Sequence, residues 1–398
     1  GYVECMSHIL DISRFVSRAH LPFDTGIDRV ERAFVLDTLQ RFAEAYFIAR
    51  IGQWFVILDA EGMHQFLHLE ANQCWPRSQG QDIFRLKLPR QQRRVRTALR
   101  NIARIHTKIE NLPAEIKALG IGAYCYTNVG HSNLSAMFFE TMRTAGARNI
   151  SAFVHDVIPL DFPQYCRANR LKPFAENMQN IMDYCDQIYC NSQYTADRVS
   201  FHFNKTPKLR VVHLPNHEIQ QNGRVEPIKF ERPTFAMLGT IEPRKNLTFI
   251  LDVWDLLAEK LPPDLMPDLI IIGKRGWEKA ETLDRMSRAK NVRELNTLSD
   301  ADVQAHLSAC VALLFPSHVE GYGLPAQEAI ALGVPVIASD IPVFRELFAD
   351  TATLLAITQA QVWVDFIQNV LLNPDNMIWN ADCSIKIKVW DDFFTEIY

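Results

Sequence analysis

The chain has 398 residues, of which 48% are hydrophobic and 22% are charged, and its formal net charge is −4. This length exceeds one ordinary hydrophobic core and predicts two domains. The composition is that of a water-soluble globular protein, the charge gives no case for nucleic-acid binding, and no apolar run reaches the roughly 18 residues of a membrane helix.

The eight cysteines show neither a paired CxxC arrangement nor a Cys/His spacing typical of metal sites. Cys185 and Cys190 lie in strand-like surroundings and are predicted to be buried free thiols. No signal peptide is recognised at the start. These features predict a cytoplasmic protein with reduced cysteines.

Short apolar runs alternate with longer helix-like runs, a pattern typical of parallel α/β layering. In the first half, strands are predicted at 8–12, 46–51, 55–58, 123–128, 150–155, 187–191 and 209–213. Helices are predicted at 26–44, 134–145, 173–185 and 195–203. After a polar, aperiodic link at 216–233, strands are predicted at 234–238, 269–272, 311–315, 336–338 and 352–355. Two doubly wound, Rossmann-like domains would present the carboxyl ends of their strands to a central cleft.

The first candidate site residue is Gly26, which follows the first strand after a long loop and begins a helix. A glycine there would let the backbone approach a phosphate or an acceptor. Arg29 lies on the same helix start and is a weaker candidate. A purely structural turn is an equally good interpretation of Gly26.

The segment 83–109 contains nine basic residues and no acidic one. As a single helix it would place four arginines on one face, opposite an apolar face, namely Arg93, Arg96, Arg100 and Arg104. Two interpretations remain open. The arginines either lie in solvent, or bind anionic lipid headgroups and hold the protein at the inner face of the cytoplasmic membrane.

His155 and Asp156 come at the end of the strand predicted at 150–155, where a doubly wound domain presents its active groups. A lone histidine is usually structural, but this position favours a role in the site. Asp156 would orient a loop or the histidine.

Gly239 ends the first strand of the second half, and Arg244 and Lys245 precede a helix whose predicted cap is Asn246. Two adjacent cations at a strand end would stabilise a diphosphate in place of a metal ion. The alternative is a solvated turn. The closest approach to an Asp-x-Asp metal motif, Asp300 and Asp302, follows Ser299 at a helix start, where carboxylates favour the dipole. No metal or other cofactor is therefore predicted.

Residues 320–328 read Glu-Gly-Tyr-Gly-Leu-Pro-Ala-Gln-Glu and lie between a predicted strand and a helix that ends near Gly333. Phosphate would bind backbone amides at this turn, aided by the helix dipole. The residues of the turn are Gly321, Tyr322, Gly323 and Leu324. Glu320 and Glu328 suit sugar hydroxyls better than phosphate, which they would repel. Glu328 lies in an apolar stretch and needs a partner, which a ribose diol would supply. The predicted ligand is a nucleotide sugar.

The two glutamates with seven residues between them resemble the paired-glutamate motif of retaining GT-B glycosyltransferases of family 4. The resemblance extends over 24–31, 154–159, 235–246, 271–277 and 334–340. It implies that Glu328 holds the ribose, Glu320 holds hydroxyls of the transferred sugar, and His155 lies beside that sugar. Many members carry an arginine where this chain has Thr240, so Arg244 is predicted to supply that guanidinium.

The resemblance also implies an acceptor-binding domain over 1–218, a nucleotide-sugar-binding domain over 219–379, and a C-terminal helix within 380–398 that crosses back onto the first domain. Retention would proceed without a protein nucleophile, because the leaving phosphate takes the acceptor proton. The variants of the motifs at 239–246 and 25–30 resemble mannosyltransferases of bacterial surface-polysaccharide assembly. They predict GDP-mannose as donor and a glycan or lipid-linked glycan as acceptor. The alternatives are a UDP-sugar donor, or a nucleotide-sugar-binding module without transfer activity.

Overall fold

The computed structural model describes residues 7–21, 25–215, 228–373 and 388–398. Most of the predicted interdomain link, the predicted boundary at 218/219, and residues 380–387 of the predicted C-terminal helix lie outside the described residues.

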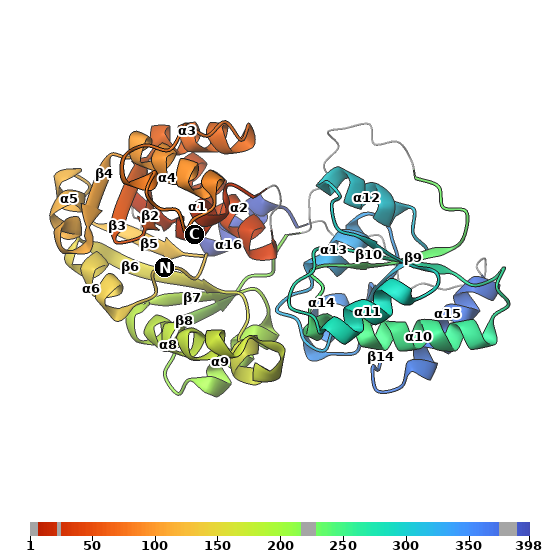
Figure 1. Ribbon diagram of the computed structural model, residues 1–398. Coiled ribbons are helices and arrows are strands. Elements are labelled where there is room, and N and C mark those ends of the chain that lie inside the picture. The colour runs from red at the N-terminus through yellow and green to blue at the C-terminus, as the bar shows by residue number, and fades with distance from the viewer. Residues whose placement is uncertain (1–6, 22–24, 216–227, 374–387) are drawn as a thin grey trace.

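The first sheet has eight strands in the order β4-β3-β2-β1-β5-β6-β7-β8 (Figure 1). The strands are β1 (Ser7–Asp11), β2 (Glu44–Ile51), β3 (Trp54–Asp59), β4 (Ile105–Lys108), β5 (Tyr124–Asn128), β6 (Ala147–Val154), β7 (Gln187–Cys190) and β8 (Lys208–Val211). All neighbours pair in parallel except β3, which is antiparallel to both β2 and β4. The carboxyl ends of β1, β2, β4, β5 and β6 therefore share one edge of the sheet.

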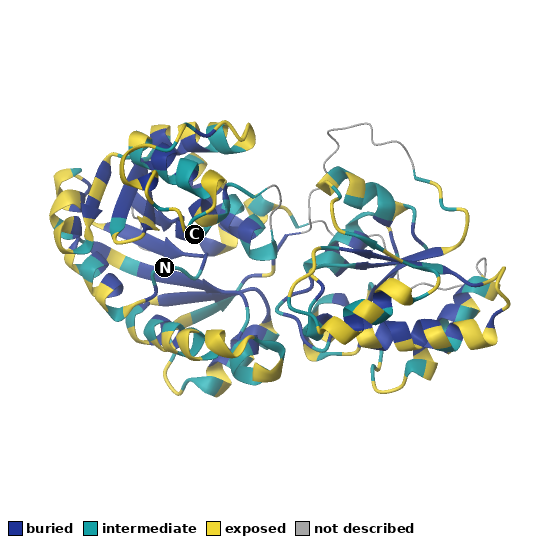
Figure 2. Cartoon of the chain, viewed as in Figure 1, coloured by how far each residue is buried: buried dark blue, intermediate teal, exposed yellow. Residues whose placement is uncertain are grey.

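The helices joined to this sheet bury their apolar residues against it in two clusters, as the dark blue interior of Figure 2 shows. They are α1 (Ser13–Arg18), α2 (Gly26–Arg41), α3 (Ala60–Ala71), α4 (Arg90–Ile102), α5 (Leu112–Ala118), α6 (Ala136–Thr144), α7 (Ile158–Asp161), α8 (Ala168–Tyr184) and α9 (Gln193–His202).

The second sheet has six strands in the order β11-β10-β9-β12-β13-β14, all parallel. They are β9 (Thr234–Leu238), β10 (Asp268–Ile272), β11 (Val292–Leu295), β12 (Ala312–Phe315), β13 (Val336–Ser339) and β14 (Thr353–Leu355). The helices are α10 (Leu247–Lys260), α11 (Ala280–Arg288), α12 (Asp300–Ser308), α13 (Leu324–Ala331), α14 (Pro342–Phe348) and α15 (Ala360–Leu372). The strand order reverses between β9 and β12, the point at which doubly wound sheets bind ligands.

The last helix, α16 (Trp390–Ile397), packs on the first sheet although it follows the second one in the chain (Figure 1). Phe393, Phe394 and Ile397 are buried in the core beside Phe34 of α2. The Tyr189 hydroxyl on β7 donates a hydrogen bond of 3.0 Å to the Ile397 carbonyl. The chain thus crosses between the two sheets twice.

Two short strands, β4 and β11, were not predicted from the sequence. Each has four residues, and polar side chains interrupt the apolar ones in their sequences, Ile-His-Thr-Lys and Val-Arg-Glu-Leu. All the strands predicted from the sequence are present, with their ends shifted by up to three residues.

The prediction of one helix through 83–109 is wrong, because α4 covers only Arg90–Ile102 and β4 begins at Ile105. The predicted apolar face does point inward at Val95 and Leu99, which are fully buried. The arginines are engaged within the protein: Arg93 donates to the Ile83 carbonyl, Arg100 pairs with the buried Asp82, and Arg104 lies beyond the helix and pairs with Asp59. Burial, Arg85 and Arg100 lower the pKa of the half-buried Arg96.

Of the cysteines, Cys74, Cys166, Cys185, Cys190 and Cys310 are free, and the last three are buried. The prediction for Cys185 and Cys190 is confirmed. Cys125 on β5 is disulfide-bonded, so the expectation of reduced cysteines throughout is wrong at that position. Within the described ranges, no helix combines the length and the apolarity that crossing a membrane would require.

Candidate functional site

Glu320 lies at the centre of a charged network between the ends of β9 and β12. Its carboxylate accepts from Arg244 Nη1 at 2.6 Å, Lys245 Nζ at 2.5 Å and Ser317 Oγ at 2.7 Å. The residue is only 6% exposed. Glu242 binds the other side of the Arg244 guanidinium at 2.6 Å. The structure thus brings together three of the predicted catalytic residues.

The pKa values of the network follow from burial and charge. Burial raises the pKa of Glu320, but the charges of Arg244 and Lys245 outweigh it and lower the value to about 2. Burial lowers the pKa of Lys245, and Glu320 opposes that effect. The pKa of Arg244 is raised, because Glu320 and Glu242 overcome its desolvation. Glu320 is therefore an anion at neutral pH and too weak a base to accept a proton there.

Backbone geometry places the two cations. Gly239 has φ of +134°, and a Cβ on it would lie 3.3 Å from Lys245 Cε, so a side chain would press on the lysine. Asn246 precedes α10, as predicted, but its backbone is left-handed and its side chain does not cap the helix. Its amide donates instead to the Pro316 carbonyl at 3.1 Å and ties the Arg-Lys turn to the loop after β12.

The end of β6 meets this network at Gly321. A Cβ on Gly321 would lie 2.9 Å from both the His155 carbonyl oxygen and Asp156 Cβ. The rings of Tyr165 and His318 stack across the same boundary with centroids 4.9 Å apart. His155, predicted from the first half of the chain, is therefore next to the Glu320 loop of the second half.

We expect Gly321→Ala to separate the two domains at this point and to reduce any activity of the site by at least tenfold. The added Cβ would meet the His155 carbonyl oxygen, and a backbone atom cannot move aside as a flexible side chain can. The control is Gly122→Ala, where an added Cβ meets no atom within 4 Å. Small-angle scattering and turnover of both variants test this. Unchanged scattering and turnover in Gly321→Ala would contradict it.

His155 is a neutral, buried histidine. Its Nε2 lies 2.8 Å from the Val129 carbonyl, which can only accept, so Nε2 carries the proton and Nδ1 is left as an acceptor. Burial, then the adjacent His131, lowers the pKa of His155 to about 3. Its ring is 5.2 Å from that of His131. The Asn191 side chain donates to its carbonyl at 2.9 Å.

His8 and His155 should each make the free energy of unfolding decrease as pH falls below about 6.5. His8 and His155 are neutral in the folded protein, with pKa values lowered by burial to about 3, whereas both titrate near 6.5 when unfolded. Their contribution is complete above pH 6.5 and is lost towards pH 3, at about 1.4 kcal/mol per pH unit for each. Glu320 adds a loss below pH 4.5.

Urea denaturation at about pH 7.5 and about pH 5 measures this slope. His8→Leu, far from the charged network, should remove part of it, because His8 is buried against Phe42. A His8→Leu variant whose stability falls as steeply with pH as that of the wild type would contradict the role of this histidine.

The starts of α2 and α13 face each other across the domain boundary. A Cβ on Gly26 would lie 2.8 Å from Leu324 Cδ1. Thr25 and Asp28 form a capping box at the start of α2. Glu328, predicted to hold a ribose, forms an ion pair with Arg29 of α2. Leu324, Glu328 and Arg29 line a cavity of about 670 Å³ between α2, α13 and α16, within the size range of small-molecule sites.

The remaining glycine-turn residues play different parts. Gly323 has φ of +109°, and a Cβ on it would clash with the rings of Phe344 and Phe348. Tyr322 is buried, and its hydroxyl donates to the Leu214 carbonyl at 3.0 Å. Tyr322 therefore fastens the turn to the end of the first domain.

Several contacts of charged residues beside the site were not predicted from the sequence. Arg14 and Arg18 of α1 both bind Asp28, at 2.9 and 2.5 Å. Glu346 of α14 accepts from the backbone amides of Gln193 and Tyr194 at the start of α9, at 2.7 and 2.8 Å. The two Glu346 contacts join residues that are 153 and 152 apart in the sequence.

Asp300 and Asp302 begin α12 beneath a Ser299 capping box, as predicted. Within the residues that the structure describes, no three His, Cys, Asp or Glu side chains are grouped so that they could hold a metal ion. Metal independence stays a prediction.

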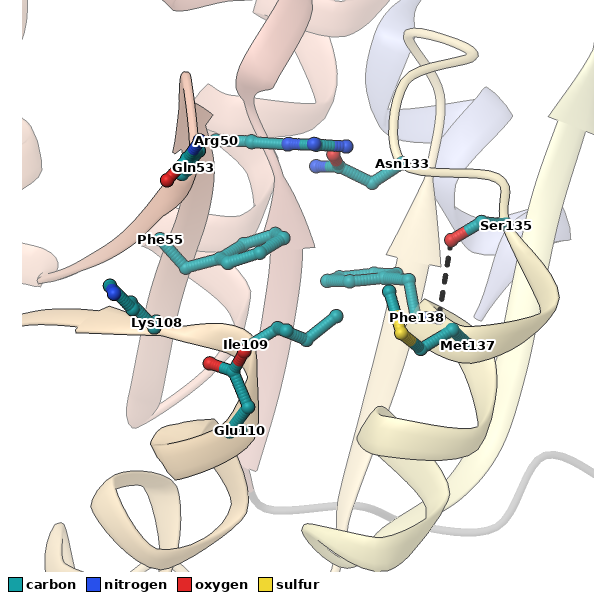
Figure 3. A pocket seen from close by; sticks show the side chains of 10 residues that line it. All are labelled: Arg50, Gln53, Phe55, Lys108, Ile109, Glu110, Asn133, Ser135, Met137 and Phe138. Carbon is teal, nitrogen blue, oxygen red and sulfur yellow. Dashed lines mark hydrogen bonds between the residues drawn. The ribbon is translucent and has the colours of Figure 1, made fainter.

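A second cavity, of about 240 Å³, lies at the carboxyl edge of the first sheet between the β2–β3 turn and the start of α6 (Figure 3). Figure 3 shows the Arg50 guanidinium reaching toward Asn133, above the rings of Phe55 and Phe138. The Asn133 amide also binds Asp11 at 2.8 Å and Ser13 at 2.7 Å, just past the end of β1. The cavity thus shares a sheet edge with His155.

Comparison with known proteins gives two curated relatives, one solved structure and one family. The chain is 29% identical over 236 residues to the serotype-specific mannosyltransferase WbdA of Escherichia coli, covering 54% of this chain and 28% of that protein. It is 26% identical over 216 residues to the O-antigen chain mannosyltransferase B of Escherichia coli, covering 51% of this chain and 56% of that one. The chain therefore spans about a quarter to a half of the length of these curated relatives.

Among solved structures, an α,α-trehalose-phosphate synthase (UDP-forming) from Burkholderia vietnamiensis superposes with a TM-score of 0.60 at 14% identity, covering 99% of this chain and 98% of that one. This likeness confirms the predicted fold class. The model of the family described as glycosyl transferases group 1 matches residues 218–382. These residues therefore form a glycosyl transferases group 1 domain, within a chain whose overall fold is GT-B.

Proposed function

We propose that this protein is a retaining glycosyltransferase of family 4 that moves a hexose from a nucleotide sugar to a glycan or lipid-linked glycan. The observation that carries the proposal is the position of Glu320. A buried carboxylate held by two cations lies at the β9/β12 switch point, against the β6 end that carries His155. The names of the relatives, both mannosyltransferases, favour GDP-mannose as donor and surface polysaccharide as product.

The chemistry assigned to these groups is stabilisation of charge. As the glycosidic bond to the nucleotide breaks, negative charge develops on the diphosphate, and Arg244 and Lys245 are the cations available to meet it. Glu320, with its pKa near 2, stays ionised and orients those cations and the sugar hydroxyls. The acceptor proton passes to the leaving phosphate. His155 Nδ1 accepts a hydrogen bond from a sugar hydroxyl.

A UDP-sugar donor is the first alternative, since the structural neighbour is named as a UDP-forming synthase. A module that binds nucleotide sugars without transferring them is the second. Thermal-shift measurements with GDP-mannose, UDP-glucose and the bare nucleotides separate the donors, because a bound ligand raises the melting temperature by mass action. GDP-mannose should give the largest shift. An unchanged melting temperature with every nucleotide sugar would contradict the proposal.

We place the acceptor in the cavity of Figure 3, because polar side chains surround an apolar surface there. The apolar surface suits the apolar face of a sugar ring, and the polar side chains suit its hydroxyls. These polar residues are Arg50, Lys108, Glu110 and Asn133. Arg50→Ala should raise the KM for the acceptor about tenfold while leaving nucleotide-sugar binding unchanged. Arg293→Ala, on β11 of the other domain, is the control. An Arg50→Ala variant with wild-type acceptor KM would exclude this location.

A cytoplasmic location, at the inner face of the membrane where a lipid-linked acceptor would be reached, is part of the proposal. The predicted route to that face, through the arginines of the segment 83–109, is weakened because Arg93, Arg100 and Arg104 have partners within the protein.

A further inference from the structure

The connection between α3 and α4 exposes two large apolar side chains at its tip. Residues 83–90 read Ile-Phe-Arg-Leu-Lys-Leu-Pro-Arg. Phe84 is 82% exposed and Leu86 is 80% exposed, the two largest values among the exposed large apolar residues of the described chain. Single exposed apolar residues are ordinary, but two of them on one short loop mark an interaction surface.

This loop is held in place by α4. Asp82, at the base of the loop, is 1% exposed, accepts from the Thr97 hydroxyl at 3.0 Å and pairs with Arg100. Arg93 donates to the Ile83 carbonyl at 3.0 Å. Within the loop, the Leu86 amide donates to Phe84 and the Leu88 amide to Arg85, both at 2.9 Å. Arg93 and Arg100 of α4 thus hold the loop in one conformation, and this conformation exposes the apolar tip to solvent.

The charge of the loop specifies the partner. Lys87 and Arg90 are exposed and form no ion pair with any described residue, and no acidic residue occurs from 83 to 109. An apolar tip flanked by unpaired cations is complementary to an anionic lipid surface, where apolar groups enter the boundary between headgroups and acyl chains. A protein partner would need an apolar groove lined with carboxylates.

The loop also lies beside the cavity of Figure 3. A Cβ on Gly52 would be 3.2 Å from an Arg85 guanidinium nitrogen, so Arg85 lies against the β2–β3 turn. Arg50 and Gln53, on either side of Gly52, line that cavity. A lipid surface bound at the loop would hold the headgroup of a lipid near the cavity. In Figure 1, α3 and α4 lie together at the top of the first domain.

We propose that residues 83–90 form a membrane-docking loop, in which Phe84 and Leu86 insert into an anionic lipid surface while Lys87 and Arg90 bind its headgroups. This proposal concerns lipid binding alone and stands whether or not the protein transfers a sugar.

Co-sedimentation with vesicles of phosphatidylcholine, with and without phosphatidylglycerol, tests it. The wild type should bind only the anionic vesicles. Phe84→Ser/Leu86→Ser should weaken that binding at least tenfold at any salt concentration, and Lys87→Ser/Arg90→Ser should weaken it most at low salt, because salt screens only the charges. Both pairs are at the surface, so an unchanged melting temperature confirms that folding is intact.

Two matched controls complete the design. Phe201 on α9 is 70% exposed and lies against Arg198, so Phe201→Ser removes a comparable apolar side chain elsewhere and should bind like the wild type. Arg104→Ser should also bind like the wild type. The proposal is overturned if the wild type ignores phosphatidylglycerol vesicles at low salt, if the Phe84/Leu86 variant still binds them fully, or if Phe201→Ser loses binding equally.

Discussion

Replacing Glu320 with Ala should reduce sugar transfer at least a hundredfold, while the affinity for the nucleoside diphosphate stays the same or increases. Glu320 occupies both cations of the site, Arg244 and Lys245, through bonds of 2.6 and 2.5 Å. Without the carboxylate, the cations are free for the diphosphate, but the hydroxyls of the transferred sugar lose their anchor. Single-turnover kinetics and calorimetry with the bare nucleotide measure the two effects separately.

Stability must be controlled in that experiment. Removing one partner of a buried ion pair costs about 3–5 kcal/mol, since Lys245 is left buried with its charge uncompensated. Glu320→Gln is the matched variant, because it keeps the shape and the Ser317 contact. Glu328→Ala should show the reverse division, with weaker nucleotide binding. Equal losses of nucleotide affinity in the two alanine variants would refute the assigned roles.

Replacing Lys245 with Ala should raise the barrier to transfer by at least about 2–3 kcal/mol, which is a loss of roughly a hundredfold in kcat/KM. The lysine lies over the Phe315 ring at 4.7 Å and is almost fully buried. The same variant leaves Glu320 with Arg244 alone. The pKa of Glu320 should therefore rise from its value near 2.

Turnover of Lys245→Ala in the presence and absence of EDTA is the measurement, with Lys260→Ala as control because Lys260 is an exposed partner of Asp365. Wild-type turnover should survive EDTA. A strict requirement for magnesium or manganese, or a fall of less than threefold in Lys245→Ala, would contradict the role of the two cations.

Most of the fold could be predicted because buried parallel strands are apolar runs that any reader of the sequence can find. The runs at 234–238 and 311–315 correspond to β9 and β12. The short strands β4 and β11 could not be found, since polar residues interrupt their four-residue sequences and leave no apolar run. The basic segment was predicted to be one helix because its arginines keep a helical spacing up to Arg104. The helix ends at Ile102, however, since the Ala103 backbone is extended.

Side chains of the site could be nominated from the sequence, but their partners could not. Glu320 and Lys245 are 75 residues apart, and Glu328 and Arg29 are 299 apart, so only the folded chain shows that these charges pair. Asn246 was found as the residue before a helix, yet its side chain bonds Pro316 rather than the helix. Residue type and strand-end position predict where a group lies, whereas tertiary packing decides what it binds.

Retaining transfer of a hexose is tested most directly by incubating the purified chain with GDP-mannose and a mannose-terminated glycan. Mass spectrometry then gives the mass of the product, and NMR gives its anomeric configuration. We expect one added hexose whose anomeric configuration matches that in the donor, with GDP released in equal amount. An added sugar of inverted configuration, or binding of nucleotide sugars with no transfer to any glycan, would contradict it.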